Sequence, residues 1–142
     1  MYLEINDYTK LEEIQKVFSD FYPFLKIEFY SKPHKRYEAS EFKFQLNSKL
    51  SVGDVKRTHV SGLLEIKPTY KVADVELEFL QRFGLSVQIF RKDQGIWEQT
   101  SDLDDFTLME LNKLSRESFE EFPEEADEKS YDEEGGTSYK FL

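Results

Sequence analysis

Two segments of this 142-residue chain, residues 2–18 and 63–79, carry the same apolar pattern at an offset of sixty-one positions. The matching positions are Leu3 and Leu64, Ile5 and Ile66, Phe18 and Phe79, and, at an offset of sixty, Leu25 and Leu85. A constant period within one chain indicates a repeated supersecondary unit. We therefore predict an internally duplicated domain, with copy one over about residues 2–56 and copy two over about residues 63–114.

Each copy reads as a strand, an amphipathic helix and two further strands. Apolar residues at helical spacing predict the helices, and alternating apolar and polar residues predict half-buried strands. The predicted strands are 2–6, 25–30, 41–46, 64–66, 85–89 and 96–100, and the predicted helices are 11–21, 72–83 and 108–114. Leu50, Val52 and Val55 offer a shorter helical counterpart to 108–114 in copy one.

Local signals mark the ends of these helices. Thr107 and Glu110 have the spacing of a capping box, as do Thr9 and Glu12. Gly84 follows the last apolar turn of 72–83, where a residue that accepts positive φ commonly closes a helix.

The order of elements predicts the α+β class. A strand, a helix and a parallel strand are joined by a right-handed crossover, so we expect a β-α-β-β unit in each copy and one mixed sheet with both main helices on one face. A ferredoxin-like or a β-grasp-like arrangement fits the same pattern.

Residues 63–112 contain the strand FGLSVQIF and the helix start Thr107-Leu108-Met109-Glu110-Leu111-Asn112. This third of the chain resembles the later part of a ubiquitin-like β-grasp domain, and also small uncharacterised bacterial α+β proteins of unassigned function. The resemblance implies a binding scaffold and not a catalyst, and it transfers no functional residues. Gly135-Gly136 is followed by six further residues, so it is not the Gly-Gly ending used for conjugation.

Composition excludes several kinds of site. The chain has no cysteine, which rules out disulfides, thiolate zinc sites and a cysteine nucleophile. No apolar run approaches the ~18 residues of a membrane span, and the first residues, MYLEIND, carry no basic segment followed by an apolar stretch, so we expect no signal peptide. We therefore expect a cytoplasmic protein that makes no membrane contact.

The net charge of −10 is unevenly distributed. Residues 117–142 contain ten acids and two lysines, a charge of −8, so residues 1–116 carry only −2. Dense like charge with little hydrophobicity predicts a disordered acidic tail over 117–142. We interpret it as a solubilising tail; docking of its aromatic residues on the basic segment Lys32–Arg36 is the alternative.

No motif indicates catalysis, a metal or a cofactor. His34 and His59 lie in predicted loops, and we interpret both as solvated. A hydrolytic or metal role would require them to converge with Asp102, Asp104 or Asp105, which the spacing does not indicate. The acids at 102–105 lack the glycine and closing glutamate of an EF-hand loop, and we interpret them as complements to the dipole of the helix that follows.

Aromatic residues on the outward face of the predicted sheet are the contact candidates. Tyr30 and Phe90 occupy equivalent places in the two copies, with Trp97 on the next strand and Lys32, Lys35 and Arg36 as charge complements. Such aromatics are frequent at interfaces, although a covering segment would make them core residues. We predict a non-enzymatic protein-interaction module that binds a protein partner or forms a homodimer.

Two other functions are kept as alternatives. The first is an enzyme or small-ligand-binding protein with a site between the two copies. The second is a nucleic-acid-binding protein regulated by its tail, which the small body charge disfavours because nucleic-acid binders carry a positive footprint.

Overall fold

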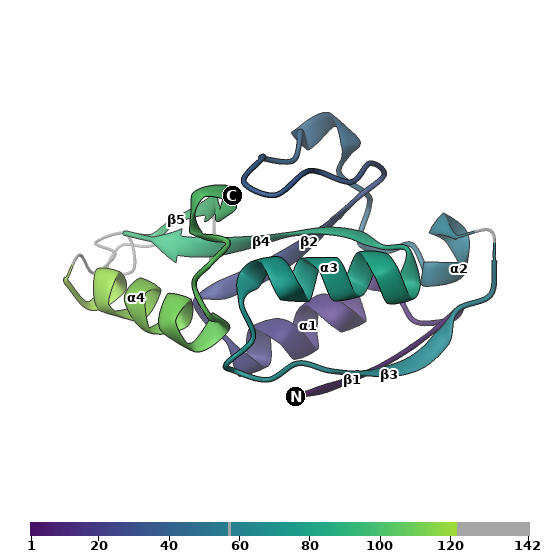
Figure 1. The fold of residues 1–142 in the computed structure, drawn as a ribbon, viewed down its shortest axis with the longest axis horizontal. Helices are drawn as coiled ribbons and strands as arrows, with labels where there is room; N and C mark the ends of the chain where they lie inside the picture. The colour runs from purple at the N-terminus through teal and green to yellow at the C-terminus, as the bar shows by residue number, and fades with distance from the viewer. Residues whose placement is uncertain (57, 122–142) are drawn as a thin grey trace.

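The computed structural model describes residues 1–56 and 58–121, and Figure 1 shows their arrangement. The chain is α+β, as predicted from the order of its elements. The strands are β1 (Tyr2–Asn6), β2 (Leu25–Tyr30), β3 (Ser61–Glu65), β4 (Ser86–Asp93) and β5 (Ile96–Gln99). The helices are α1 (Leu11–Phe21), α2 (Val52–Val55), α3 (Val72–Phe83) and α4 (Leu108–Glu121), with 3₁₀ turns η1 (Phe42–Phe44) and η2 (Ser101–Leu103).

The strands form two antiparallel sheets, so the prediction of one mixed sheet is wrong. β1 pairs with β3, with Leu3 opposite Leu64. β4 lies between β2 and β5, with Ile89 opposite Ile27. Figure 1 shows α1 and α3 between the two sheets. A parallel crossover would need β1 and β2 in one sheet, but the helix layer separates them because both sheets turn apolar side chains toward it.

The core consists of these inward side chains. Its largest fully buried members are Phe18, Phe29, Phe79, Ile5, Leu11, Ile14, Leu25, Ile27, Leu64, Ile66, Ile89 and Leu108. The rings of Phe29 on β2 and Phe79 on α3 meet edge to face at 6.2 Å between centroids. Each such side chain contributes about 1.5–3 kcal/mol by leaving water, so the helix layer holds the two sheets together.

The ends of the helices follow their local chemistry, with one exception. Gly84 closes α3 at φ 65°, and Thr107 and Glu110 form the predicted capping box of α4 at 3.0 and 3.1 Å. The box predicted from Thr9 and Glu12 is wrong, because the Thr9 hydroxyl accepts from Asn6 N–H and α1 begins one residue later.

α4 continues to Glu121, so the first five residues assigned to the acidic tail are helical. The hydroxyl of Ser118 explains the extension: it accepts from Gln94 N–H at 2.9 Å and donates to Asp93 at 2.8 Å, which ties the last turns to the β4–β5 hairpin. The rest of the predicted tail, residues 122–142, lies outside the described residues.

The segment between β2 and α2 departs most from the prediction. Residues 41–46 contain the 3₁₀ turn η1 (Phe42–Phe44) instead of a strand, and their pairing with β2 is reduced to a bridge between Tyr30 and Gln45. We name residues 31–46 the cover loop, because Ser40 hydrogen-bonds Gln99 and Gln88 on the sheet face that lies opposite the helices.

Hydrogen bonds recur at matching positions of the two segments. The backbone pairs are Leu11 N to Leu50 O and Val72 N to Phe106 O, both at 2.9 Å, and Val52 N to Thr9 O at 2.8 Å and Leu108 N to Tyr70 O at 3.0 Å. Isolated bridges join Lys10 to Ser51 and Lys71 to Thr107. The start of each long helix is thus held by the residues that lead into a capped helix, α2 in one case and α4 in the other.

Candidate functional site

Side chains, and not a neighbouring strand, contact the outer edge of the first half of β4, residues 86–89. β5 pairs only with Phe90–Asp93. The backbone groups of residues 86–89 on the same edge of β4 therefore need other partners. Ile89 N–H donates to the carboxylate of Glu76 at 3.1 Å, and Val87 O lies 3.1 Å from Nε2 of His34. α3 and the cover loop therefore meet at this edge.

His34 is directed inward, so its prediction as a solvated loop residue is wrong. Its side chain is 10 % exposed, and Nε2 also lies 3.5 Å from Oε1 of Glu76. The other ring nitrogen, Nδ1, lies 2.9 Å from Lys35 O. A neutral imidazole has an N–H on one nitrogen only, so which of the two contacts His34 donates to depends on its tautomer. His59, by contrast, is exposed and contacts Asp7.

Glu76 is a buried acid on α3 that the sequence interpretation missed. Its side chain is 8 % exposed, and burial raises its pKa to about 8, with a further increase from the nearby charge of Asp104, while the Ile89 N–H opposes the shift. The signal was present: Glu76 lies on the same helix face as Val72, Val75 and Phe79. A charged residue within an apolar helix face is a candidate site residue because its burial needs a partner.

Asp104 lies in the turn that leads to α4 and is completely buried. Its Oδ2 accepts from Tyr37 N–H at 2.9 Å, and Tyr37 takes φ 66°. Its Oδ1 has no hydrogen-bond partner among residues 1–56 and 58–121. Burial raises the pKa of Asp104, although the Tyr37 N–H lowers it. Asp104 therefore binds the cover loop and does not act as the simple helix-dipole complement that we predicted.

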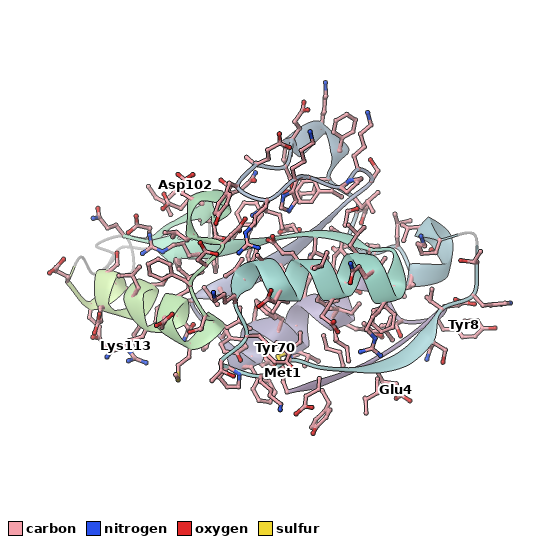
Figure 2. All side chains as sticks on the ribbon, in the orientation of Figure 1. Met1, Glu4, Tyr8, Tyr70, Asp102 and Lys113 are labelled. Atoms are coloured by element: carbon pink, nitrogen blue, oxygen red, sulfur yellow. The ribbon has the colours of Figure 1, made fainter. Side chains whose placement is uncertain are left out.

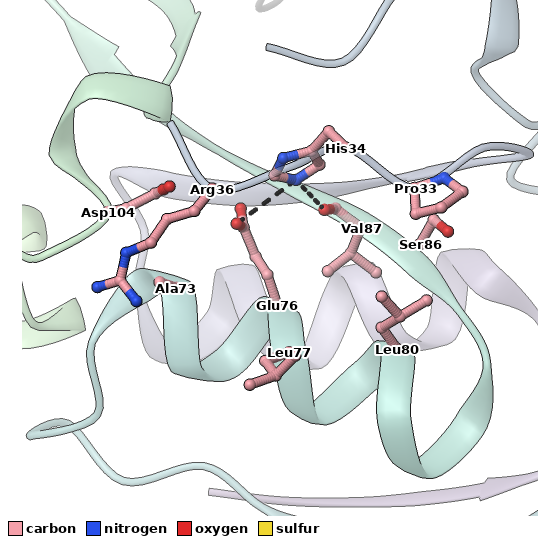
Figure 3. A pocket seen from close by; sticks show the side chains of 10 residues that line it. All are labelled: Pro33, His34, Arg36, Ala73, Glu76, Leu77, Leu80, Ser86, Val87 and Asp104. Atoms are coloured by element: carbon pink, nitrogen blue, oxygen red, sulfur yellow. Dashed lines mark hydrogen bonds and ion pairs between the residues drawn. The ribbon is translucent and has the colours of Figure 1, made fainter. Parts of the chain in front are cut away.

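These three residues line one pocket of about 140 Å³, drawn in Figure 3. The pocket lies between the cover loop of the first segment and α3, β4 and Asp104 of the second. Its other lining residues are Pro33, Arg36, Ala73, Leu77, Leu80, Ser86 and Val87. We name it the His34 pocket. In the described part of the chain, no three histidine or acidic side chains are placed to hold a metal ion.

A second feature is a cluster of aromatic and basic side chains on the sheet surface. Lys26 Nζ lies 5.1 Å from the ring centroids of both Phe90 and Trp97. Lys92 Nζ lies 5.8 Å from Trp97 and 5.9 Å from Phe119 of α4. Lys26, Phe90, Lys92 and Trp97 are partly exposed, and we name these four residues the open face.

The open face contains Phe90 and Trp97, two of the three predicted aromatic contact residues, whereas Tyr30 lies elsewhere. Tyr30 is 3 % exposed and pairs with Ser86, whereas Phe90 lies opposite Lys26 nearer the other end of β2. The cover loop buries Tyr30, which is the covered-core outcome considered from the sequence. Burial also raises the pKa of its hydroxyl.

The three predicted charge complements are exposed and differ in their contacts. Lys32 lies over the ring of Phe44 at 4.5 Å, Arg36 pairs with Asp105, and Lys35 is exposed. His34, between them, points inward. The side chains that adjoin Phe90 and Trp97 are instead Lys26 and Lys92, which the alternation of β2 and β4 places on the outward face.

Comparison of the chain with protein-family models, with curated proteins and with solved structures finds no match. None of the helices formed by residues 1–56 and 58–121 is both long enough and apolar enough to cross a membrane.

Proposed function

We propose that this chain is a non-enzymatic protein-interaction module whose open face binds an acidic polypeptide segment. The observation that carries the proposal is the position of Lys26 between Phe90 and Trp97 on a partly exposed sheet surface. Aromatic rings supply contact area at low entropic cost, and lysine between them attracts carboxylates while it stacks on the rings.

The charge of the open face favours a foreign partner over a homodimer. A symmetric contact of this face with itself would bring Lys26 and Lys92 of one copy against the same lysines of the other, and like charges across an interface are unfavourable. An acidic segment would instead bring carboxylates against Lys26 and Lys92, and opposite charges across an interface are favourable. The chain contains one such sequence: residues 122–142 hold seven acids, two lysines and four aromatic residues.

We also propose that the two segments are copies of one β-α-β unit followed by a capped helix, with the extra strand β5 in the second copy alone. The support is the recurrence of equivalent hydrogen bonds and bridges at the starts of α1 and α3 and at the capped helices α2 and α4. A scaffold with two similar halves presents different side chains on equivalent strands, and in this chain only the second half carries the aromatic pair Phe90 and Trp97.

Trp97 provides a direct test, because it is the only tryptophan of the chain and lies in the open face. A chain ending at Glu121, which keeps α4 complete, is titrated with a synthetic peptide of residues 122–142 while tryptophan emission is followed. We expect a saturable change. The double variant K26Q/K92Q should bind about fivefold to thirtyfold more weakly, since two partly exposed charge contacts of about 0.5–1 kcal/mol each sum to about 1–2 kcal/mol.

The control is K16Q/K49Q, which removes two lysines that are 76 % and 73 % exposed and lie outside the open face. It should bind within twofold of the parent chain. Absence of a saturable change in the parent chain, or equal weakening by both double variants, would refute binding at the open face. Light scattering of the full chain tests the homodimer separately.

The alternative function, an enzyme or small-ligand-binding protein with a site between the copies, has one supporting observation. The His34 pocket joins the cover loop of the first segment to α3 of the second and contains buried ionisable groups. It is separate from the open face, so the two functions can be tested independently.

A further inference from the structure

The hydrogen-bonding groups of the His34 pocket are unevenly matched. Several of its polar contacts are already made within the chain: Ile89 N–H donates to Glu76, one N–H of Arg36 donates to Asp105, and Nε2 and Nδ1 of His34 lie 3.1 Å from Val87 O and 2.9 Å from Lys35 O. The oxygens that remain are Oε1 of Glu76, which has only the 3.5 Å approach of His34, and Oδ1 of Asp104. When Glu76 and Asp104 are ionised, the pocket therefore offers two carboxylate oxygens to a donor, beside the hydroxyl of Ser86 in its lining.

Asp104 is the stronger indication of a ligand. Its side chain is fully buried, yet one carboxylate oxygen has no partner among the described residues. An unsatisfied buried polar atom is costly and needs an explanation. Figure 3 shows the carboxyl group of Asp104 directed toward the side of the pocket where Glu76 lies, so a donor that reaches Oδ1 of Asp104 from the pocket also approaches Glu76.

The opposite wall of the pocket is apolar. Leu77 and Leu80 of α3 are 48 % and 36 % exposed, and with Pro33 they line the side away from Asp104. The cavity volume of about 140 Å³ is below the ~300–1,000 Å³ of pockets that hold drug-sized ligands. A ligand that fits has a donor-rich head, a short alkyl body and few heavy atoms.

We propose that the His34 pocket binds a primary ammonium group on a short alkyl chain, with the nitrogen between Glu76 and Asp104 and the chain along Leu77 and Leu80. An ammonium group brings three donors and no acceptor, which matches the spare oxygens. A carboxylate or phosphate would instead face two acids. The same chemistry is offered by a free alkylamine and by the tip of a lysine side chain.

Proton release gives this binding mode a signature of its own. The pKa of Glu76 near 8 means that its carboxyl group is largely protonated at pH 7. An ammonium ion beside it favours the carboxylate, so binding at pH 7 should release a proton. Calorimetry in two buffers of different ionisation enthalpy measures that release.

The experiment titrates the full chain with n-butylamine, with Nα-acetyl-lysine amide and with n-butanol as the uncharged control. Side-chain NMR signals of His34 report occupancy. We expect saturable shifts with proton release for n-butylamine and none for n-butanol. A response to acetyl-lysine amide equal to or stronger than that to n-butylamine assigns the site to lysine side chains, and a weaker one assigns it to free amines.

Variants of the pocket acids, with matched controls outside the pocket, complete the test. Glu76→Gln and Asp104→Asn should each weaken n-butylamine binding at least tenfold. Glu78→Gln, which alters a half-exposed acid of α3 outside the pocket, should leave it within twofold, as should Trp97→Ala. Equal responses to butylamine and butanol, or shifts that do not saturate, would mean that the pocket holds water only and would overturn the proposal. That comparison uses the parent chain and does not depend on how the variants fold.

Discussion

The acid at position 76 should make the stability of this protein fall as pH rises through neutrality. Three groups face the Glu76 carboxyl group: His34 of the cover loop, Asp104 of the turn before α4 and Ile89 N–H of β4. Its pKa is about 8 in the folded chain and 4.5 as an ordinary side chain. Because the folded value is the higher one, the contribution to stability is complete below about pH 4.5 and is lost as pH increases toward 8.

The magnitude follows from the same difference. A tenfold change in a proton affinity is worth about 1.4 kcal/mol, so the full range corresponds to about 5 kcal/mol, and water that enters the pocket on ionisation reduces this to about 2–4 kcal/mol. Urea denaturation of the parent chain at several pH values from 5 to 8.5 measures the loss. Glu76→Gln should flatten the profile, whereas Glu78→Gln should reproduce the parent. A parent profile that is flat or rises over this range would contradict the burial argument.

Two further predictions concern the fold. Thr107→Ala and Ser51→Ala each remove a hydroxyl that accepts an N–H at a helix start, at 3.1 and 3.2 Å, so each should lower the free energy of unfolding by about 1 kcal/mol; a cost for Thr107→Ala within error of zero in thermal denaturation would contradict its capping role. Phe79→Ala removes a fully buried ring that packs on Phe29 and should cost about 3–5 kcal/mol, whereas Phe42→Ala, at a ring that is 81 % exposed, should change stability by less than about 0.5 kcal/mol in the same assay.

The elements that depend on local chemistry could be read from the sequence. The apolar spacing of α1 and α3, the glycine that closes α3 and the Thr107 cap act within a few residues of one another, so periodicity and cap spacing predict them. The division into two sheets could not be predicted in this way. It depends on which strands pair across the helix layer, and the same alternation is compatible with several strand orders.

In the candidate sites, too, some positions follow from local sequence patterns and others only from tertiary folding. Alternation along β4 and β5 placed Phe90 and Trp97 on the outward face, and that placement agrees with the structure. Tyr30 had the same alternation signal, but the cover loop buries it, because residues 41–46 contain a 3₁₀ turn (Phe42–Phe44) near the end of β2 instead of a strand along it. His34, Glu76 and Asp104 are brought together only by tertiary folding, so no spacing rule joins them.

The contacts of His34 and Glu76 with the backbone of residues 86–89 of β4 affect how this region can move. Separating two paired strands requires several backbone hydrogen bonds to break together, and local unfolding of this kind takes microseconds to seconds. His34 and Glu76 can instead leave Val87 and Ile89 by rotation about their own side-chain bonds. Such rotations occur in picoseconds to nanoseconds where a side chain is exposed and more slowly where it is packed. A small molecule can therefore exchange with the interior at this point while the β2–β4 pairing stays intact.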